Sequence, residues 1–321
     1  MDQGNFPKGK KLNRITSAII ASSLPFFAAM SAPAFAQEAE EKAEDFENII
    51  VTGTRMSNRS AADSPVPVDV ITGEEFRQNS SSDVQDMLRT NVPSFDVNTQ
   101  PISDAATIVR PANMRGLSPD NVLVLVNGKR RHRGSIISFL GGGISDGAQG
   151  VDISAIPSLA LKQVEVLRDG ASSQYGSDAI AGVLNFLLRD DDEGFEFRAN
   201  YGSTYEGDGD NYTISANAGF SLGADGFVNI TGEIRDVEGT VRSVVRDDVQ
   251  GMVDAGYLSQ SDFSTINTYT NEVPQYWGQP DVEDDYKVFI NSAYELNDKA
   301  ELYLFGNYGK RTVTGGFFYR N

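Results

Sequence analysis

The sequence has no cysteine and a single histidine, His132, among its 321 residues. Without cysteine there can be no disulfide framework, cysteine-ligated zinc or thiol nucleophile, and a lone histidine leaves no second one for a metal cluster. Basic residues are outnumbered, 27 against 45 acidic ones, for a formal net charge of −18. That balance argues against a general nucleic-acid binder, which needs a basic surface. These absences exclude several chemistries without naming one.

Long apolar runs are also missing, except for one near the N-terminus. A hydrophobic fraction of 40% is nevertheless enough for a folded core. A chain of 321 residues suggests about two domains.

Residues 1–36 have the pattern of a secretory signal peptide. Four basic residues between positions 8 and 14 precede the mostly apolar stretch Ile15–Met30, and Ala34-Phe35-Ala36 supplies a cleavage site before Gln37. The apolar stretch is shorter than the about 20 residues that a membrane-spanning helix needs. A short N-terminal anchor helix is therefore the less favoured alternative to export and cleavage near Ala36.

Residues 37–57 are predicted to form a flexible leader. Acidic, polar residues 37–48 precede an apolar island that consists of Ile49, Ile50, Val51, Thr52 and Gly53. On a mobile tether such an island suits β-strand addition to the sheet edge of a partner. The alternative is that it forms the first strand of the next domain, and its residues alone do not separate the two.

Residues 58–193 are predicted to form one compact domain that mixes strands and short helices. The expected strands are 66–70, 121–126, 156–167 and 183–188, and Asn127-Gly128 predicts a hairpin turn. Helix starts are predicted at the capping box Thr72–Glu75 and at the S-x-x-Q sequence Ser82–Gln85. Long loops rich in Gly and Ser, such as 134–150, are usually functional.

One local feature opposes the global charge. Six basic side chains lie between Arg110 and Arg133, against the single acid Asp120. They could bind an anionic ligand or pair with acids elsewhere, and the acidity of the chain favours pairing. The acidic run Glu206–Asp210 lacks the distal Glu of an EF-hand, so we interpret it as an exposed turn rather than a calcium site.

Residues 194–321 change to alternating strands, expected at 195–202, 211–220, 227–236, 285–295 and 300–310. Each is apolar on one face and polar on the other, and aromatic residues lie near the ends. The turns at 221–226 and 296–299 are short, whereas the connection from 237 to 284 is long. This pattern favours a membrane β-barrel over a soluble sandwich.

Five stretches resemble one family. Asn48–Arg55 (NIIVTGTR) is similar to a TonB box, and Met114–Leu117 with Val122–Arg131 is similar to the middle of a plug domain. Val164–Gly176 and Ala179–Phe186 are similar to the closing signature of the plug. With these motifs the chain resembles the TonB-dependent outer-membrane receptors. The resemblance favours the alternative in which Ile49–Gly53 lies on a flexible leader and adds as a strand to a partner's sheet.

The resemblance implies a plug inside a barrel of about 22 strands. It implies that TonB, powered through ExbB and ExbD, pairs with Ile49–Gly53. Arg115, Glu165 and Arg168 would fix the plug against the barrel wall, and the basic stretch near Arg130 would find acidic partners on the lumen face of the strands.

The implied function is energy-dependent uptake of a scarce nutrient such as a siderophore, cobalamin or an oligosaccharide. The implied location is the outer membrane of a Gram-negative bacterium, with its lipid as a further partner. No covalent step is involved, so the chain is expected to be neither an enzyme nor a holder of a cofactor or catalytic metal. The substrate-binding residues stay unknown, although loops 98–113 and 134–150 are expected to face outward.

The expected fold is an α+β plug, with a small mixed sheet and short helices, followed by an incomplete antiparallel transmembrane β-barrel. Residues 194–321 have room for five or six of about 22 strands. The alternative function is therefore a truncated plug-bearing binding protein, or a non-functional receptor fragment that forms no closed pore. The short leader argues against a signalling domain before Ile49, and a secreted hydrolase lacks any acid–base pair with a defensible placement.

Overall fold

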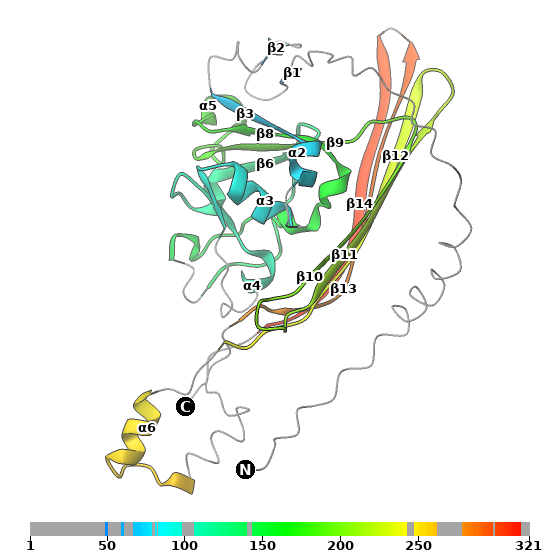
Figure 1. Ribbon diagram of the computed structural model, residues 1–321. Helices are drawn as coiled ribbons and strands as arrows, with labels where there is room; N and C mark the ends of the chain where they lie inside the picture. Colours follow the sequence, from blue (N-terminus) through cyan, green and yellow to red (C-terminus); the bar gives the residue numbers. More distant parts are fainter. Residues whose placement is uncertain are drawn as a thin grey trace, which may run out of the picture. The chain divides into compact units, whose positions relative to one another are not determined.

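The computed structural model describes residues 49–50, 59–60, 67–78, 81, 83–97, 106–139, 143–242, 247–261, 278–297 and 299–315, with the backbone alone at 49–50, 59–60 and 247–250. These residues belong to one compact unit, Glu47–Asn321. A small mixed sheet with short helices comes first in the chain, and a longer antiparallel sheet follows it (Figure 1). The predicted signal peptide lies outside the described residues.

The mixed sheet has five strands in the order β3-β8-β9-β6-β7. Their bounds are β3 Val68–Thr72, β6 Val122–Val126, β7 Lys129–Arg130, β8 Leu161–Leu167 and β9 Gly182–Leu188. Strands β6 and β9 are parallel, and the other neighbours are antiparallel. This arrangement confirms the small mixed sheet, and β4 Phe95–Val97 pairs with β5 Ala112–Met114 beside it.

One predicted strand is shorter than expected. Strand β8 begins at Leu161 rather than near residue 156, because two 3-10 turns, Ile153–Ala155 and Ser158–Ala160, precede it. Pro157 lies between the turns and has no N–H to donate to a sheet ladder. Further 3-10 turns are Pro119–Asn121 and Gly143–Ser145.

The helices of this α/β module are short: α2 Gly73–Gln78, α3 Val84–Asn91, α4 Ala106–Val109 and α5 Ser172–Tyr175. The predicted capping box at α2 is present, since Glu75 N donates to Thr72 Oγ1 and Thr72 N donates to Glu75 Oε2. The prediction at α3 was wrong by one residue. Its N-cap is Asp83, whose Oδ1 accepts from Gln85 N at 2.9 Å, and not Ser82.

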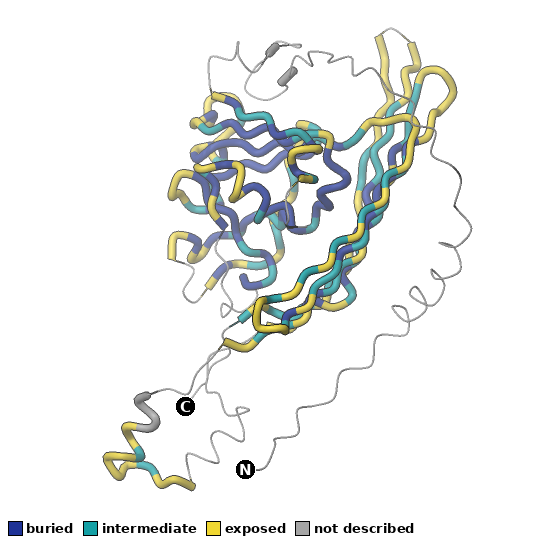
Figure 2. The backbone as a smooth tube through the Cα atoms, viewed as in Figure 1, coloured by how far each residue is buried: buried dark blue, intermediate teal, exposed yellow. Residues whose placement is uncertain are grey.

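The core of the module lies between the sheet and its helices. Phe76, Met87, Leu161 and Phe186 are among its fully buried side chains. Figure 2 shows that most of the module's strands are buried. The turn Asn127-Gly128 joins β6 to β7 with φ values of 47° and 71°, as the hairpin prediction requires.

The long sheet has the order β10-β11-β12-β13-β14, and every neighbouring pair is antiparallel. The bounds are β10 Phe195–Gly202, β11 Asn211–Ser221, β12 Gly226–Val237, β13 Asp281–Asn297 and β14 Ala300–Thr314. All five predicted strands are present, and the last two are longer than expected. The described residues form an open sheet rather than a closed barrel.

A short helix and a pair of two-residue strands lie outside the two five-stranded sheets. Helix α6, Asp247–Asp254, lies in the long connection between β12 and β13 and was not predicted. Strand β1 (Ile49–Ile50) of the leader pairs with β2 (Arg59–Ser60), just after the leader. Within the described parts of the chain, no helix is both long and apolar enough to cross a membrane.

Candidate functional site

The long sheet has its polar face buried and its apolar face exposed. On β12, Asn229, Thr231 and Glu233 are at most 4% exposed, whereas Ile230 and Ile234, which alternate with them, are 39% and 37% exposed. Figure 2 shows this alternation along the strands. A soluble antiparallel sheet does the opposite, because it buries its apolar face in its own core.

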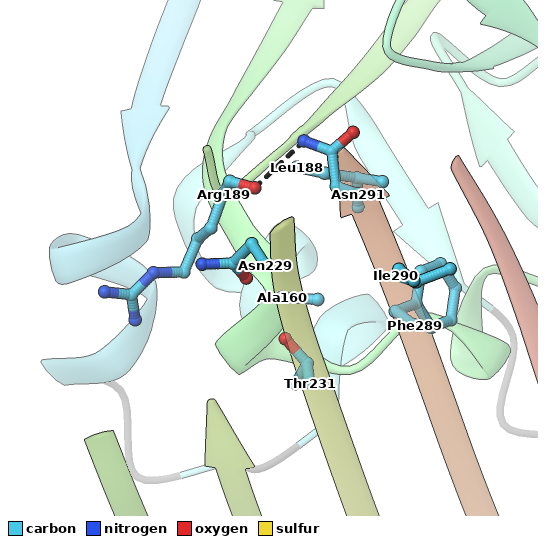
Figure 3. Close-up of a pocket in the computed structure, with 8 residues that line it drawn as sticks. All are labelled: Ala160, Leu188, Arg189, Asn229, Thr231, Phe289, Ile290 and Asn291. Atoms are coloured by element: carbon cyan, nitrogen blue, oxygen red, sulfur yellow. Dashed lines mark hydrogen bonds between the residues drawn. The ribbon is translucent and has the colours of Figure 1, made fainter. Parts of the chain in front are cut away.

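The buried polar face contacts the α/β module. Asn127 of the β6–β7 turn donates to Asn291 Oδ1 on β13 at 3.0 Å, and Asn291 Nδ2 donates to the Arg189 carbonyl at 2.9 Å. A cavity of about 10 Å³ at this contact is lined by Ala160, Leu188 and Arg189 of the module and by Asn229, Thr231, Phe289, Ile290 and Asn291 of the sheet (Figure 3). Such a volume is close to the minimum for one water, so the two parts are closely packed here.

An apolar contact lies beside this polar one. Phe289 of β13 belongs to the buried core of the module, and Phe305 of β14 packs against that core. Tyr303 stacks on Phe305 with ring centroids 6.4 Å apart, and the Lys129 ammonium lies 5.4 Å from the Tyr303 ring centroid. The sheet therefore adds side chains to the core of the module.

A charged cluster joins the module to β12. Asp83 Oδ2 lies 2.6 Å from Arg110 Nη2 and 3.1 Å from Arg235 Nη1 on β12. Asp86 lies 3.3 Å from the other terminal nitrogen of Arg110. Gln85 is fully buried, and its Nε2 donates to the Arg110 carbonyl at 2.9 Å. These contacts place the start of α3, the end of α4 and strand β12 together.

The charges within this cluster shift the pKa values of Asp83, Asp86 and Arg110. Burial raises the pKa of the Asp83 carboxyl, but the charges of Arg110 and Arg235 outweigh burial and hold this pKa well below its usual range. Asp86 behaves differently, because burial and the neighbouring Asp83 charge raise its pKa. Burial lowers the pKa of Arg110, and the two aspartates more than compensate. Asp83 is therefore a carboxylate at neutral pH, paired with two arginines.

A second ion pair joins the module to the last strand. Arg311 Nη2 of β14 lies 2.8 Å from Asp152 Oδ2. Inside the sheet, Lys287 Nζ lies 2.7 Å from Glu233 Oε1 and 3.5 Å from Asp285 Oδ2. Buried charges need partners of this kind, because an unpaired charge in a dry interface is costly.

The ends of the long sheet meet different parts of the module. At the end with the short turns, Ser221 Oγ donates to the Asp192 carbonyl, which belongs to the segment between β9 and β10. At the end with the long connection, Gly315 lies beside Thr107 of α4. Gly134, at the base of loop 134–150, lies next to Val109 of the same helix. Helix α4 and loop 134–150 therefore belong to the long-connection end.

Comparison with known families decides the identity of the module. The family profile described as "TonB-dependent Receptor Plug Domain" matches residues 60–183. Residues 60–183 are a TonB-dependent receptor plug domain. With the strands that follow, the chain has the fold of the N-terminal portion of such a receptor, namely a plug and the first part of its barrel.

Solved structures share this fold. The ferric enterobactin receptor PfeA from Pseudomonas aeruginosa, as a point mutant in complex with enterobactin, matches with a TM-score of 0.56 and 19% identity over 78% of this chain and 34% of that one. The siderophore receptor PirA from Acinetobacter baumannii matches with a TM-score of 0.53 and 20% identity, over 77% of this chain and 32% of that one. The chain thus spans about a third of the length of these receptors.

Two of the residues expected to anchor the plug have partners inside the plug. Arg115 Nη1 lies 3.5 Å from Asp169 Oδ1, and both side chains are exposed. Arg168 Nε lies 2.8 Å from Asp69 Oδ2. Their role against a barrel wall stays a prediction.

The third expected anchor, Glu165, is fully buried in the plug sheet. Its Oε2 accepts from Asn185 Nδ2 at 3.2 Å, and Asn185 Oδ1 accepts from Gly128 N at 3.0 Å. These contacts link β8, β9 and the β6–β7 turn, and the anchoring role of Glu165 is likewise untested.

The basic stretch between Arg110 and Arg133 pairs with acidic side chains, as the sequence predicted in preference to binding of an anionic ligand. The resemblance had implied acidic partners on the barrel strands near Arg130, and this was wrong in its location. Arg130 forms its ion pair with Asp178 of the plug itself. The barrel contact of its neighbour Arg131 is to an amide, since Nη1 donates to Asn307 Oδ1 at 2.6 Å.

The acidic turn after β10 also has a basic partner. Both terminal nitrogens of Arg242 donate to Asp208 at 2.6 Å. Of the expected TonB box, the backbone of Ile49 and Ile50 is described as β1, and residues 51–53 lie outside the described residues.

Sequence analysis did not single out the residues that join the plug to the barrel strands. The signal was present on the polar faces of the strands, where Arg235 and Arg311 replace the usual neutral residues. Their partners could not be found in this way, because Asp83 and Arg235 are 152 positions apart.

Proposed function

We propose that this chain provides the plug and first barrel strands of an outer-membrane receptor that takes up a scarce nutrient in a TonB-coupled process. The observation that carries the proposal is the long sheet, whose polar face binds a plug domain while its apolar face stays exposed. A sheet with these faces suits lipid outside and a filled lumen inside. The matched solved structures are receptors, which supports binding and transport rather than catalysis.

The proposed energy source is TonB, driven by ExbB and ExbD in the inner membrane. The segment Ile49–Gly53 would add as a strand to the sheet of the periplasmic domain of TonB, with backbone hydrogen bonds supplying the affinity. The extended backbone of β1 supports this role. The end of the barrel strands with short turns would face the periplasm, as it does in outer-membrane barrels.

A peptide spanning residues 45–56 tests this coupling. We expect it to bind the purified periplasmic domain of TonB in calorimetry. The same peptide with Ile50→Pro should bind far more weakly, because proline removes a backbone donor from the added strand. Absence of binding by the native peptide at high micromolar concentration would overturn the proposed coupling.

The proposed ligand is a small nutrient that binds at the long-connection end. The PfeA structure contains enterobactin and PirA is named a siderophore receptor, which supports a siderophore here ahead of cobalamin or an oligosaccharide. Loop 134–150 has three exposed apolar side chains, Ile137, Phe139 and Ile144, next to exposed His132 and Arg133. Such a surface suits a ligand with apolar or aromatic faces and negative charge.

Uptake in iron-limited cells tests the ligand class. Cells that carry the receptor as their only route should accumulate radiolabelled iron from a ferric siderophore. Phe139→Ala should raise the half-saturating concentration by roughly tenfold, as loss of a buried aromatic contact does. Tyr205→Ala, on the turn after β10, is the matched exposed-aromatic control. Unchanged uptake by Phe139→Ala would remove this loop from the ligand site, and uptake of cobalamin alone would exclude the siderophore.

A further inference from the structure

The contacts of Arg110 join the end of α4 to the start of α3. Its guanidinium pairs with Asp83, and its carbonyl accepts from the buried Gln85 amide. Its backbone N–H donates to the Ala106 carbonyl and so closes α4. Its φ of 48° is unusual for a residue with a side chain. The surrounding contacts must hold this conformation, so Arg110 is well placed to respond when α4 moves.

Asp83 contacts both Arg110 in the plug and Arg235 on barrel strand β12. Its side chain is nearly inaccessible, and its Oδ2 receives both Arg110 and Arg235. Arg235 lies on β12, which is hydrogen-bonded to β11 and β13 over most of its length. A single carboxylate oxygen therefore ties the end of α4 to a strand whose position the sheet fixes.

We propose that Arg110 is a positioning residue that couples the long-connection end of the plug, through Asp83, to barrel strand β12. This inference rests on the proposed function, because the long-connection end is where a ligand would bind. When ligand contact shifts α4, Arg110 leaves Asp83, and the start of α3 that carries Asp83 loses its tie to α4. Fewer contacts then hold Asp83 in place for Arg235, so the plug is easier to displace from β12.

Residues 1–321 contain no cysteine, so one thiol introduced here, in a receptor with any cysteine elsewhere replaced by serine, reports one position. Ala106→Cys places a reporter on α4, and Thr231→Cys places one on the plug-facing side of β12. Both positions are 1% exposed, so a maleimide reacts only when the packing around them opens. Ala181→Cys, in the fully buried plug core, shows whether the plug stays folded.

The test measures maleimide labelling of the full-length receptor in outer membranes, without ligand or TonB. The barrel variant Arg235→Gln should speed labelling on α4, and the plug variant Arg110→Gln should speed labelling on β12. Removing one partner of a buried ion pair is strongly destabilising, so we expect increases of roughly tenfold or more. Asp83→Asn should speed both, while its amide oxygen still caps α3.

Asp86→Asn is the matched control, because it removes the more exposed partner of the same Arg110. It should leave both rates within about twofold, as expected for a weak surface pair. If Arg110→Gln exposes the plug core reporter, Arg235→Gln carries the test from the barrel side. The proposal is overturned if each variant affects only the reporter in its own part, or if Asp86→Asn matches Asp83→Asn.

This design separates the inference from the proposed function. Labelling needs neither ligand nor TonB, so a TonB-box peptide that fails to bind leaves the expected rates unchanged. Conversely, uncoupled labelling rates would leave TonB binding and uptake intact and would refute only the role of Arg110.

Discussion

Asp83 uses its two carboxylate oxygens for different purposes. One caps the first turn of α3, and the other pairs with Arg110 and Arg235. A helix cap could be any short polar residue, but the second role requires a negative charge in a dry interface. The charge therefore ties the stability of the interface to pH.

The pH dependence of this contribution has a definite sign. The pKa of Asp83 is depressed in the folded state, so its stabilisation is complete above the ordinary Asp pKa of about 3.9 and disappears as pH falls below that value. The charged groups that face it are Arg110, Arg235, Lys287 and Asp86. Asp86 has the opposite shift, since its raised pKa favours protonation in the folded state.

We therefore expect Asp83→Asn to lower the free energy of unfolding by about 3 kcal/mol at neutral pH. The difference from the native protein should persist at pH 5 and shrink below about pH 4, where Asp83 of the unfolded chain takes up a proton while the native carboxylate is still charged. Urea unfolding in detergent micelles over this pH range measures it. A difference that already disappears between pH 7 and pH 5 would contradict the assignment of the charge to Asp83.

At the scale of elements, strands β10 to β14 and the strands of the plug bury different faces. Strand β6 is buried on both sides, as expected for a strand in the interior of a packed sheet. Strand β12 buries its polar residues and exposes its apolar ones. The two burial patterns follow from what surrounds each strand. Strand β6 lies in a dry core, whereas the outer face of β12 would contact lipid under the proposed function.

Ile230 tests the lipid-facing assignment. It lies near the middle of β12, opposite Ala218 on one side and Ile290 on the other, with its side chain on the exposed face. Ile230→Arg should destabilise the receptor in lipid vesicles by about 2–4 kcal/mol, because a charge would enter the hydrocarbon. Unfolding by urea from vesicles measures the loss.

Ile230→Leu is the control and should change stability by less than about 1.5 kcal/mol. If Ile230→Arg were as stable in vesicles as Ile230→Leu, the exposed face of the sheet could not be in contact with lipid.

At the scale of the molecule, the excess of acidic residues has an uneven distribution. The predicted leader and the strand connections carry many of the acids, whereas the plug contains the basic stretch Arg110–Arg133. Much of that stretch is neutralised by neighbouring acids such as Asp83, Asp120 and Asp178. The net charge of the chain therefore says little about the charge inside the interface.

Export is the remaining prediction at this scale. We expect the mature receptor to begin at Gln37, because Ala34-Phe35-Ala36 fits the small-residue requirement of the signal peptidase. N-terminal sequencing of protein from outer membranes measures this directly. Ala36→Leu should leave the precursor uncleaved, and a mature chain that still begins with the apolar stretch would support the anchor-helix alternative instead.

The sequence by itself determined the features that depend on neighbouring residues. The Thr72–Glu75 capping box, the Asn127-Gly128 turn and the alternation along the five long strands are local patterns, and each is present in the structure. The predicted N-cap of α3 was wrong by one residue because of a contact with distant parts of the chain. Asp83 is the residue that Arg110 and Arg235 hold, so the cap forms there and not at Ser82.

Only the tertiary structure decided which residues join the plug to the strands. Asp83 with Arg235, Asp152 with Arg311, and Asn127 with Asn291 are each more than 150 positions apart. No local pattern records such a pairing, because it depends on which faces meet once both sheets have formed. The sequence could show that the strands have a polar face, but only packing against the plug decides which charge on that face meets which partner.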